Sequence, residues 1–235
     1  RILSFVLVLC LFVSCLPIFS VAAENNDIVI LYENDVHCEI DSYAKLAALK
    51  KELSETAAYV GIVSAGDFVQ GSSLGAISQG EYIANIMNLV GYDAVALGNH
   101  EFDYKLARLL ELSDMMNTKP ICCNFQKIGE TNTVFEPYRI VSYGEIDIAY
   151  IGVTTPDTMT SSSPAQFKDE NGEYAYTFNG TNLYETVQNS IDSALVTGAD
   201  YVVALTHLGT ENVYEQWSAQ TLVANTSGID VVLDG

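Results

Sequence analysis

The chain has 235 residues, of which 49% are hydrophobic, so it can form one large domain or two small ones with a substantial core. That composition excludes intrinsic disorder. Ten basic residues against 30 acidic ones give a formal net charge of −20 at pH 7. Such a surface repels phosphate backbones, which argues against a nucleic-acid polymer as a partner unless metal ions mediate the contact. It disfavours a bare acidic membrane surface for the same reason.

The first 23 residues have the pattern of a secretory signal peptide. Residues 2–19 are almost continuously apolar, follow the basic Arg1 and precede small residues at 20–23. A membrane anchor is the alternative, because an apolar run of this length can just cross a bilayer, but the small residues favour cleavage after Ala23. Lipidation at Cys15 is a second alternative. We predict an exported protein, secreted, periplasmic or at the cell surface, without stable membrane insertion after cleavage.

Cysteine usage predicts no disulfide framework. After cleavage the chain keeps Cys38, Cys122 and Cys123, an odd number of which two are adjacent. We expect buried free thiols. A single bridge from Cys38 is the open alternative in an oxidising compartment.

Short apolar runs predict the first strands of the mature chain, at 28–31 and 59–63. Between these runs, leucines recur at helical spacing. This spacing predicts a helix at 43–54, with Asp41 and Ser42 available to cap its start.

A unit of helix, glycine and buried strand then occurs three times. Glycine supplies the left-handed C-cap that ends the helix, and each apolar run is typical of a strand buried on both faces. Repetition of this unit predicts an α/β sheet covered by helices. The units are a helix ending at Gly91 with a strand at 94–97, a helix ending at Gly198 with a strand at 201–205, and a weaker helix at 214–225 with a strand at 229–233.

Residues 124–180 interrupt this repetition. Strands are predicted at 134–142 and 145–152. The segment 154–176 is rich in Ser, Thr, Asp and Gly, so we expect a long surface excursion beside the sheet, of the kind that often shapes a binding site.

Every histidine of the mature chain comes just after a predicted strand. Ligands of open α/β sheets bind beyond the carboxyl ends of the strands, so His37, His100 and His207 would meet at one edge. Taken singly, each has a simpler role, such as a buried imidazole with satisfied hydrogen bonds. Their joint placement with acidic and amide side chains predicts a metal site, and mixed nitrogen and oxygen ligands suit Zn²⁺, Mn²⁺ or Fe. The accompanying side chains are Asp35, Asp67, Asn99 and Asp103.

The spacing of these residues has a physical basis. In an extended backbone, residues i and i+2 point the same way, so Asp35 and His37 can hold one ion together. Glycines directly before Asp67 and Asn99 allow the backbone to turn sharply and approach a metal.

Specific motifs occupy four of the strand ends. They are NDVH at 34–37, GDFVQG at 66–71, GNHEFD at 98–103 and THLG at 206–209. Together with IGVTTPDT at 151–158, these motifs resemble the signatures of the calcineurin-like metallophosphoesterases. The resemblance covers residues 27–235 and is to the 5′-nucleotidase branch, which includes UDP-sugar hydrolases and 2′,3′-cyclic-nucleotide phosphodiesterases.

The resemblance implies a four-layer α/β/β/α sandwich with two divalent metal ions at the C-terminal ends of the strands. Zn²⁺ or Mn²⁺ would fit the ligand types. The implied ligands are Asp35 and His37 for the first ion, Asp67 as the bridge between both, and Asn99 and His207 for the second ion.

The resemblance also implies a hydrolytic mechanism. A hydroxide bridging the ions would attack phosphorus, while His100, oriented by Asp103, would stabilise the phosphoryl group or protonate the leaving oxygen. The implied substrate is a small nucleotide or nucleotide sugar. A different ester, such as a cyclic nucleotide, is the alternative within this fold. An inactive metal- or ligand-binding module is the alternative outside enzymes.

Three departures from the family pattern stand out. Cys38 lies where glycine is usual and Tyr32 where a polar residue is common, so we expect Cys38 to perturb the first ion or its neighbour. The family's last ligands come from a Gly-His-x-His motif, whereas this chain has Asp234 and Gly235 at that strand end. We therefore interpret residues 24–235 as a catalytic domain that is C-terminally incomplete and lacks the family's nucleotide-binding C-terminal domain.

Overall fold

The computed structural model describes residues 26–210 and 214–235. The expected signal peptide, residues 1–23, lies outside these described residues. Among the helices within them, none is long and apolar enough to cross a membrane.

A parallel sheet forms from the N-terminal part of the described chain. Strands β1 (Ile28–Glu33), β2 (Tyr59–Ser64) and β3 (Ala94–Val95) pair in that order. The two strands predicted first are confirmed, and each extends slightly past its predicted end. The strand predicted at 94–97 is shorter, because after Val95 the chain continues only as an isolated bridge from Ala96.

A second, mixed sheet forms from the later part of the chain. Its order is β5 (Tyr138–Tyr143), β6 (Ile146–Thr154), β8 (Tyr201–His207) and β9 (Val231–Asp234). Strand β5 is antiparallel to β6, and the other pairs are parallel. All four strands were predicted, although β5 starts only at Tyr138, after Pro137.

The two sheets share a buried core. Alternation along β2 sends Ile62 toward the helices and Val63 toward the second sheet. Residues of β6 alternate likewise, with Tyr150 in the core shared by the sheets and Ile151 in the core under α7. Because both faces of these strands are buried, the strands appear in the sequence as unbroken apolar runs.

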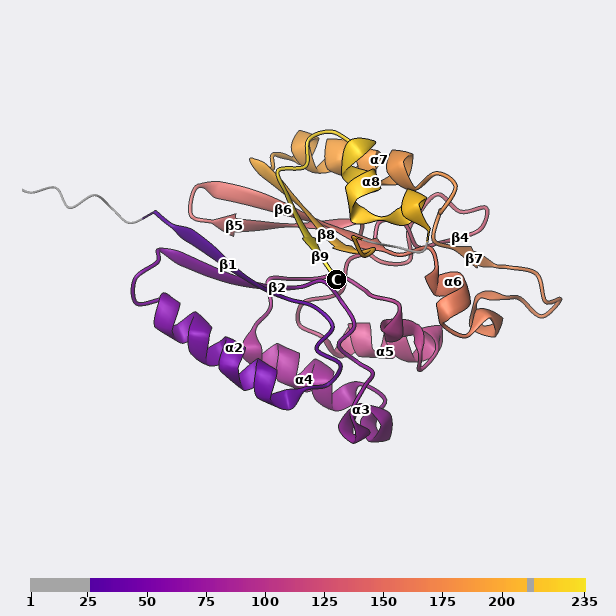
Figure 1. Cartoon of the computed structure of the whole chain (residues 1–235), viewed down its shortest axis with the longest axis horizontal. Coiled ribbons are helices and arrows are strands. Elements are labelled where there is room, and N and C mark those ends of the chain that lie inside the picture. The colour runs from indigo at the N-terminus through magenta and orange to yellow at the C-terminus, as the bar shows by residue number, and fades with distance from the viewer. Residues whose placement is uncertain (1–25, 211–213) are drawn as a thin grey trace, which may run out of the picture.

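Helices cover the outer side of the first sheet (Figure 1). The predicted helix at 43–54 is α2 (Ile40–Leu53), whose N-cap is Glu39, so the expected cap by Asp41 and Ser42 is wrong because both lie within the first turn. The helix that ends at Gly91 is α4 (Glu81–Val90), and Gly91 has the predicted left-handed conformation. Two further helices, α3 (Ser73–Ser78) and α5 (Leu106–Met115), were not predicted.

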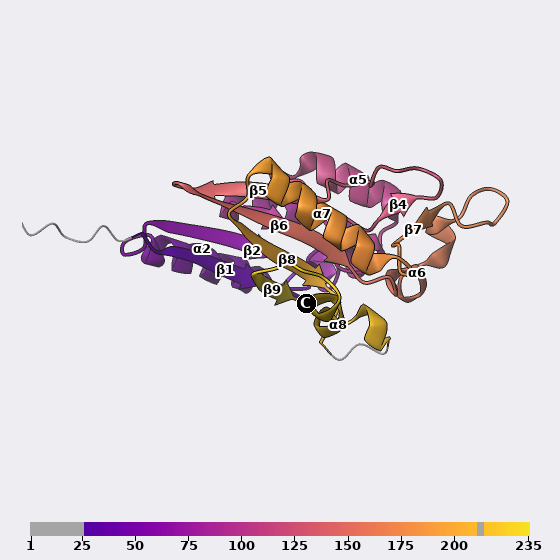
Figure 2. The ribbon, with the colours of Figure 1, turned by 90° about the horizontal axis from the view of Figure 1, so that it is seen from above.

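Two helices cover the outer side of the second sheet. Figure 2 shows α7 (Leu183–Thr197) running along β6, and Gly198 ends this helix as predicted, with φ +116°. The weak helix predicted at 214–225 is divided into the 3₁₀ turn η3 (Glu215–Trp217) and α8 (Ala219–Ala224), with Ser218 capping the latter. The α/β fold class is thus confirmed.

The segment between β6 and α7 is better anchored than the expected surface excursion. It forms α6 (Thr158–Ser161), the 3₁₀ turn η2 (Pro164–Phe167) and β7 (Tyr176–Thr177), which pairs with β4 (Gln126–Lys127). Phe167 and Phe178 are fully buried in an aromatic cluster with Phe102 and Phe125. A few aromatic residues, the pairing of β7 with β4 and the hydrogen bonds of Gln166 to Phe102 and Leu106 therefore anchor a segment whose composition is mostly polar.

The cysteines in the described part of the chain are buried free thiols, as expected. Cys38, Cys122 and Cys123 are each at most 1% exposed and form no disulfide. Burial raises the pKa of each of these thiols.

Candidate metal centre

The loop after β1 carries two candidate ligands in a left-handed backbone conformation. Asp35 and His37 have φ angles of +52° and +46°, so the extended backbone expected for this pair is wrong. The main-chain N–H of Asp35 donates to the carbonyl of Gly66 at 3.1 Å, and that of His37 donates to the carbonyl of Asp67 at 3.0 Å. These bonds fix the loop to the end of β2, and strained backbone of this kind clusters at functional sites.

Two glycines let the loops after β2 and β3 approach each other. A Cβ atom on Gly66 would lie 2.3 Å from the main-chain nitrogen of Gly98, and one on Gly98 would lie 2.2 Å from Oδ1 of Asp67. Gly66 also has φ +103°, which other residues rarely adopt. A side chain on Gly98 would displace Asp67, and one on Gly66 would displace the main chain of Gly98, in agreement with the sharp turns predicted here.

Main-chain carbonyls hold two histidines so that their Nε2 atoms face Asp67. Nδ1 of His207 lies 2.8 Å from the carbonyl oxygen of Ala65, and Nδ1 of His37 lies 3.0 Å from that of Gln70. Because a carbonyl only accepts, each Nδ1 carries the proton. The Nε2 atoms of His207 and His37 lie 3.1 and 3.8 Å from Oδ2 of Asp67. Metal-binding histidines typically donate their other N–H in this way.

Asp67 is the buried centre of the site, only 2% exposed. Its Oδ1 accepts the main-chain N–H of His100 at 2.8 Å. Burial opposes the charged carboxylate, but the hydrogen bond and the charge of His207 outweigh it and lower the pKa of Asp67. Burial also opposes the charged imidazole, but the bond to Asp67 raises the pKa of His207 to about 9. The two shifts are reciprocal, because the carboxylate of Asp67 and the imidazolium of His207 each stabilise the charge of the other.

His100 is paired with the acidic residue three positions later. Its Nδ1 lies 2.6 Å from Oδ2 of Asp103, and its ring meets that of His37 edge to face, with centroids 5.1 Å apart. Burial lowers the pKa of His100, but the hydrogen bond to Asp103 outweighs it, so the pKa is raised overall.

The candidate ligand atoms form two groups that share Asp67. Within each group, the ligand atoms lie within 4.8 Å of one another. Imidazole nitrogens and carboxylate oxygens this close together fit a divalent transition metal. One group is His37, Asp67 and His100; the other is Asp35, Asp67 and His207. Asn99 lines the same hollow, which has a volume of about 400 Å³.

Glu101 is a residue of the site whose role the sequence did not reveal. It is 1% exposed and belongs to neither group of candidate ligands. Its carboxylate accepts four main-chain N–H groups at 2.7 to 3.2 Å, from Asp67, Phe68, Val69 and Gly98. Burial, with the charge of Asp67, raises the pKa of Glu101 to about 7, although the N–H donors oppose this shift. The signal available in the sequence was the Glu of the GNHE motif.

Cys38 and Tyr32, which depart from the expected motif pattern, lie in different surroundings. The Cys38 thiol donates to the carbonyl of Phe68 at 3.3 Å and packs in the core under α2 and α4, so it belongs to neither group of candidate ligands. Cys38 therefore makes no direct contact with the candidate ligands of the kind that would produce the expected effect on the first ion. The Tyr32 hydroxyl donates to the main-chain carbonyl of Asp234, which links β1 to β9.

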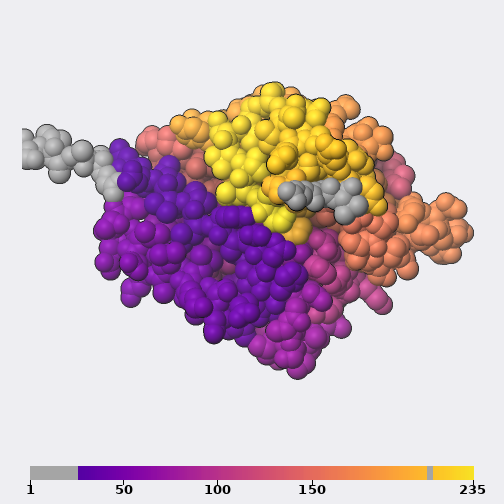
Figure 3. Space-filling model, in the orientation of Figure 1, coloured from indigo at the N-terminus to yellow at the C-terminus, as the bar shows by residue number. Residues whose placement is uncertain are grey.

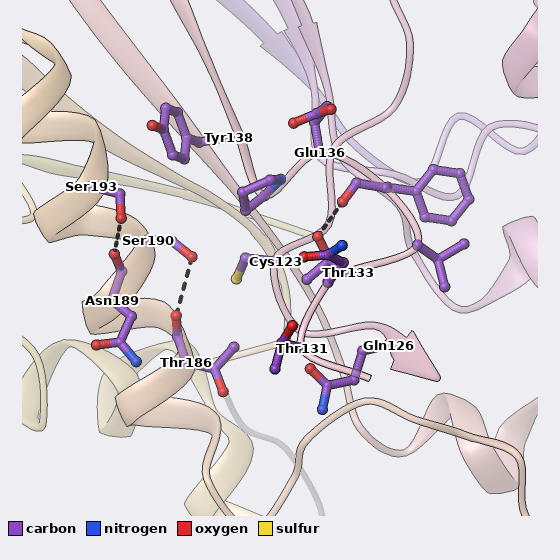
Figure 4. Close-up of a pocket in the computed structure, with 14 residues that line it drawn as sticks. Cys123, Gln126, Thr131, Thr133, Glu136, Tyr138, Thr186, Asn189, Ser190 and Ser193 are labelled. Atoms are coloured by element: carbon purple, nitrogen blue, oxygen red, sulfur yellow. Dashed lines mark hydrogen bonds between the residues drawn. The ribbon is translucent and has the colours of Figure 1, made fainter. Parts of the chain in front are cut away.

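A larger hollow than the one at the candidate ligands lies away from them. Figure 4 shows it between α7 and the segment from Gln126 to Tyr138, with a volume of about 630 Å³. Its hydroxyl groups are largely satisfied by the protein, since Thr133, Ser190 and Ser193 donate to main-chain carbonyls. The candidate metal ligands therefore lie at the strand ends and not in this hollow.

Comparison with known proteins identifies the family. The family model described as calcineurin-like phosphoesterase matches residues 28–235. The chain is 30% identical to the snake venom 5′-nucleotidase of Gloydius brevicauda over 92% of its own length and 38% of that protein. It is 27% identical to the 5′-nucleotidase of Bos taurus, over 91% of this chain and 38% of that protein.

A solved structure supports the same family. The calcineurin-like phosphoesterase YfkN from Bacillus subtilis matches with a TM-score of 0.72 and 25% identity, over 88% of this chain and 70% of that chain. The present chain thus spans little more than a third of the length of the 5′-nucleotidases it matches. On its fold, its strand-end motifs and these matches, the chain belongs to the calcineurin-like phosphoesterase family.

Proposed function

We propose that residues 24–235 are the catalytic domain of an exported, metal-dependent phosphoesterase that hydrolyses nucleotides in the manner of a 5′-nucleotidase. The observation that carries this proposal is the pair of ligand groups sharing the buried Asp67. A carboxylate common to two groups fits a bridge between two ions. The matched relatives named 5′-nucleotidases support the choice of nucleotide as substrate.

We assign Asp35, His37 and Asp67 to one divalent ion, and Asp67, Asn99 and His207 to the other, with Zn²⁺ or Mn²⁺ as the fitting metals. This division follows the motif resemblance and differs from the two groups of neighbouring ligand atoms, which place His37 with His100 and Asp35 with His207. It is supported by the distances from Nε2 of His37 to Oδ1 of Asp35, 3.7 Å, and to Oδ2 of Asp67, 3.8 Å. When bound, the ions would supply an activated water molecule and neutralise charge on the phosphoryl group. Among the described residues that line the hollow, none is Lys or Arg. Apart from its histidines, the lining therefore offers no fixed positive charge, so binding of an anionic ester here should depend mainly on metal.

We assign proton transfer to His100. Asp103 holds the Nδ1 proton of His100, which leaves Nε2 to donate a hydrogen bond to the phosphoryl group or a proton to the leaving oxygen. The raised pKa of His100 keeps the imidazole protonated over a wider pH range than an isolated histidine.

The test replaces His100 by alanine in the purified protein supplied with Mn²⁺ or Zn²⁺. Loss of a general acid should lower the kcat for AMP about 10²-fold or more. Metal content, measured by equilibrium dialysis, should stay close to that of the wild type, because Asp67 and His207 remain. A His207→Ala variant is the matched control and should lose metal as well as activity. Unchanged turnover of His100→Ala would refute the assignment.

Two other outcomes identify the alternatives. If a cyclic nucleotide or a nucleotide sugar is cleaved faster than AMP, the reaction is a related ester hydrolysis. Uptake of metal without release of phosphate from any ester would identify a binding module instead.

Export forms part of the proposal and rests on residues 1–23. A cleaved leader predicts that the mature N-terminus is Glu24, which N-terminal sequencing of the exported protein can establish. The small-molecule substrate agrees with the acidic surface, which argues against nucleic-acid polymers.

A further inference from the structure

The end of strand β9 lies directly beside the candidate ligand His207. Strands β8 and β9 pair in parallel, with Thr206 opposite Asp234 (Figure 1). The main-chain N–H of Gly235 donates to the carbonyl of Thr206 at 3.0 Å, and that of Gly209 donates to the carbonyl of Gly235 at 3.2 Å. Hydrogen bonds thus connect the end of β9 to the chain on either side of His207.

One carboxylate oxygen of Asp234 holds both chain neighbours of His207. Its Oδ1 accepts hydrogen bonds from the hydroxyl of Thr206 at 2.6 Å and from the main-chain N–H of Leu208 at 2.9 Å. Thr206 and Leu208 are 0% and 3% exposed, so water has little access to replace the carboxylate. The backbone from which the imidazole projects is therefore fixed from both sides by a single acceptor.

The imidazole of His207 packs against the same strand end. A Cβ atom on Gly235 would lie 2.6 Å from Nδ1 of His207, and this Nδ1 also lies 2.8 Å from the carbonyl oxygen of Ala65. The direction of Nε2, which faces Asp67 at 3.1 Å, thus depends on the position of β9 as well as on the chain after β2. Groups that fix the ring of a metal-binding histidine in this way tune its affinity for metal.

Asp234 is itself fixed to the first sheet. The hydroxyl of Tyr32, on β1, donates to the main-chain carbonyl of Asp234. Strand β1 leads directly into the loop that carries Asp35 and His37. The residue that holds His207 is therefore connected to the strand that precedes the candidate ligands of the other ion.

We infer that Asp234 is a positioning residue of the metal centre, which fixes His207 for the ion that it would share with Asp67. Asp234 belongs to neither group of candidate ligands and does not line their hollow, so it acts through His207 and not on the ion. The inference rests on the proposed function for the presence of that ion. Loss of such a supporting group typically lowers metal affinity about 10- to 100-fold.

Asp230 offers a comparison within the same strand pair. It lies directly before β9, at the opposite end from Asp234, and its Oδ2 accepts the main-chain N–H of Val202 at 2.8 Å. Both carboxylates connect β9 to β8, but only that of Asp234 does so beside His207. Removal of either should therefore lower the urea concentration at which the protein unfolds, whereas only removal of Asp234 should weaken metal binding.

The test measures binding of Mn²⁺ alone to the metal-stripped protein by equilibrium dialysis. Asp234→Ala should raise the Kd of one bound ion about 10- to 100-fold, while Asp230→Ala should bind Mn²⁺ as the wild type does. Asp234→Asn should restore the affinity, because its amide oxygen can accept from the same two donors. Wild-type affinity in Asp234→Ala, or an equal loss in Asp230→Ala, would overturn the inference. So would an Asp234→Asn variant that binds as weakly as Asp234→Ala.

A milder variant keeps the test valid if Asp234→Ala does not fold. Thr206→Val has nearly the shape of the native side chain and removes only one of the two donors to Asp234. The Kd for Mn²⁺ should then rise about fivefold, because the N–H of Leu208 still holds the carboxylate. An unchanged Mn²⁺ affinity of Thr206→Val would likewise overturn the inference.

Hydrolysis of AMP separates this inference from the proposed function. If the wild type hydrolyses AMP with Mn²⁺ while Asp234→Ala binds Mn²⁺ equally well, the inference fails and the proposed function stands. If Asp234→Ala weakens Mn²⁺ binding as expected but the wild type releases no phosphate from AMP or any other ester, the inference stands for a metal-binding module and the proposed function fails.

Discussion

Glu101 supports the loops that carry the candidate ligands, without being a candidate ligand itself. Its two carboxylate oxygens each accept two main-chain N–H groups, which joins the loop after β2 to the loop after β3. The partners in the first loop lie 32 to 34 positions away in the chain. Because these partners are main-chain groups that any residue type provides, the sequence around Glu101 contains no pattern that predicts them.

Replacing Glu101 by glutamine should destabilise the protein. The amide group would face donors rather than accept from them, and each buried donor left unpaired costs roughly 1–3 kcal/mol. With two donors affected, we expect the free energy of unfolding in urea to fall by about 2–6 kcal/mol. Glu55→Gln, at an exposed position, is the control and should change it by less than about 0.5 kcal/mol. Equal stability of Glu101→Gln and wild type would contradict this role.

The elements that could be predicted have ends that the sequence marks clearly. Helices α4 and α7 end at Gly91 and Gly198, and buried apolar strands follow them. By contrast, α5 begins after Lys105 without a side-chain cap and ends at Met116 in an extended conformation. No glycine marks the end of α5, so the pattern of helix, glycine and strand did not predict this helix.

The clustering of the candidate site residues was predicted better than their backbone conformation. Clustering of acidic residues and histidines after strands follows from sheet geometry alone. The left-handed conformation of Asp35 and Asp67 does not, because it is imposed by hydrogen bonds and contacts with loops distant in the chain. Asx residues tolerate this conformation better than most, but the local sequence does not require it.

The aromatic anchoring of the segment between β6 and α7 can be tested at Phe167. Removal of this fully buried ring leaves a cavity against Phe102, Phe125 and Phe178, so Phe167→Ala should lower the free energy of unfolding by about 3–5 kcal/mol. Tyr174→Ala is the control in the same segment, because Tyr174 is 44% exposed. If both variants unfold at the same urea concentration, the segment is not anchored as described.

At the scale of the whole molecule, the candidate metal centre joins two sheets. Asp35, Asp67 and Asn99 follow strands of the first sheet, whereas His207 ends β8 of the second. The hydrogen bond between His207 and Ala65 crosses from one sheet to the other. In Figure 3 the indigo N-terminal and yellow C-terminal parts of the chain meet along one seam.

Removal of metal should therefore destabilise the whole molecule. A ligand at a hundred times its Kd adds about 2.7 kcal/mol of stability, and for a domain of this size that corresponds to a Tm shift of roughly 5–10 °C. Calorimetry of the protein with excess Mn²⁺ or Zn²⁺, and again after chelation, measures the shift. The His207→Ala variant should show a smaller shift. An identical Tm in both conditions would show that metal does not connect the two sheets.

The bond from His207 to Ala65 has a consequence for how this protein can evolve. The distance from Nε2 of His207 to Asp67 depends on how the two sheets sit against each other, and that depends on residues of the shared core such as Tyr150 and Val203. A substitution there that shifts one sheet by a fraction of an ångström would alter the spacing of the ligands without touching any of them. Selection for activity should therefore constrain the shared core more tightly than selection for folding alone.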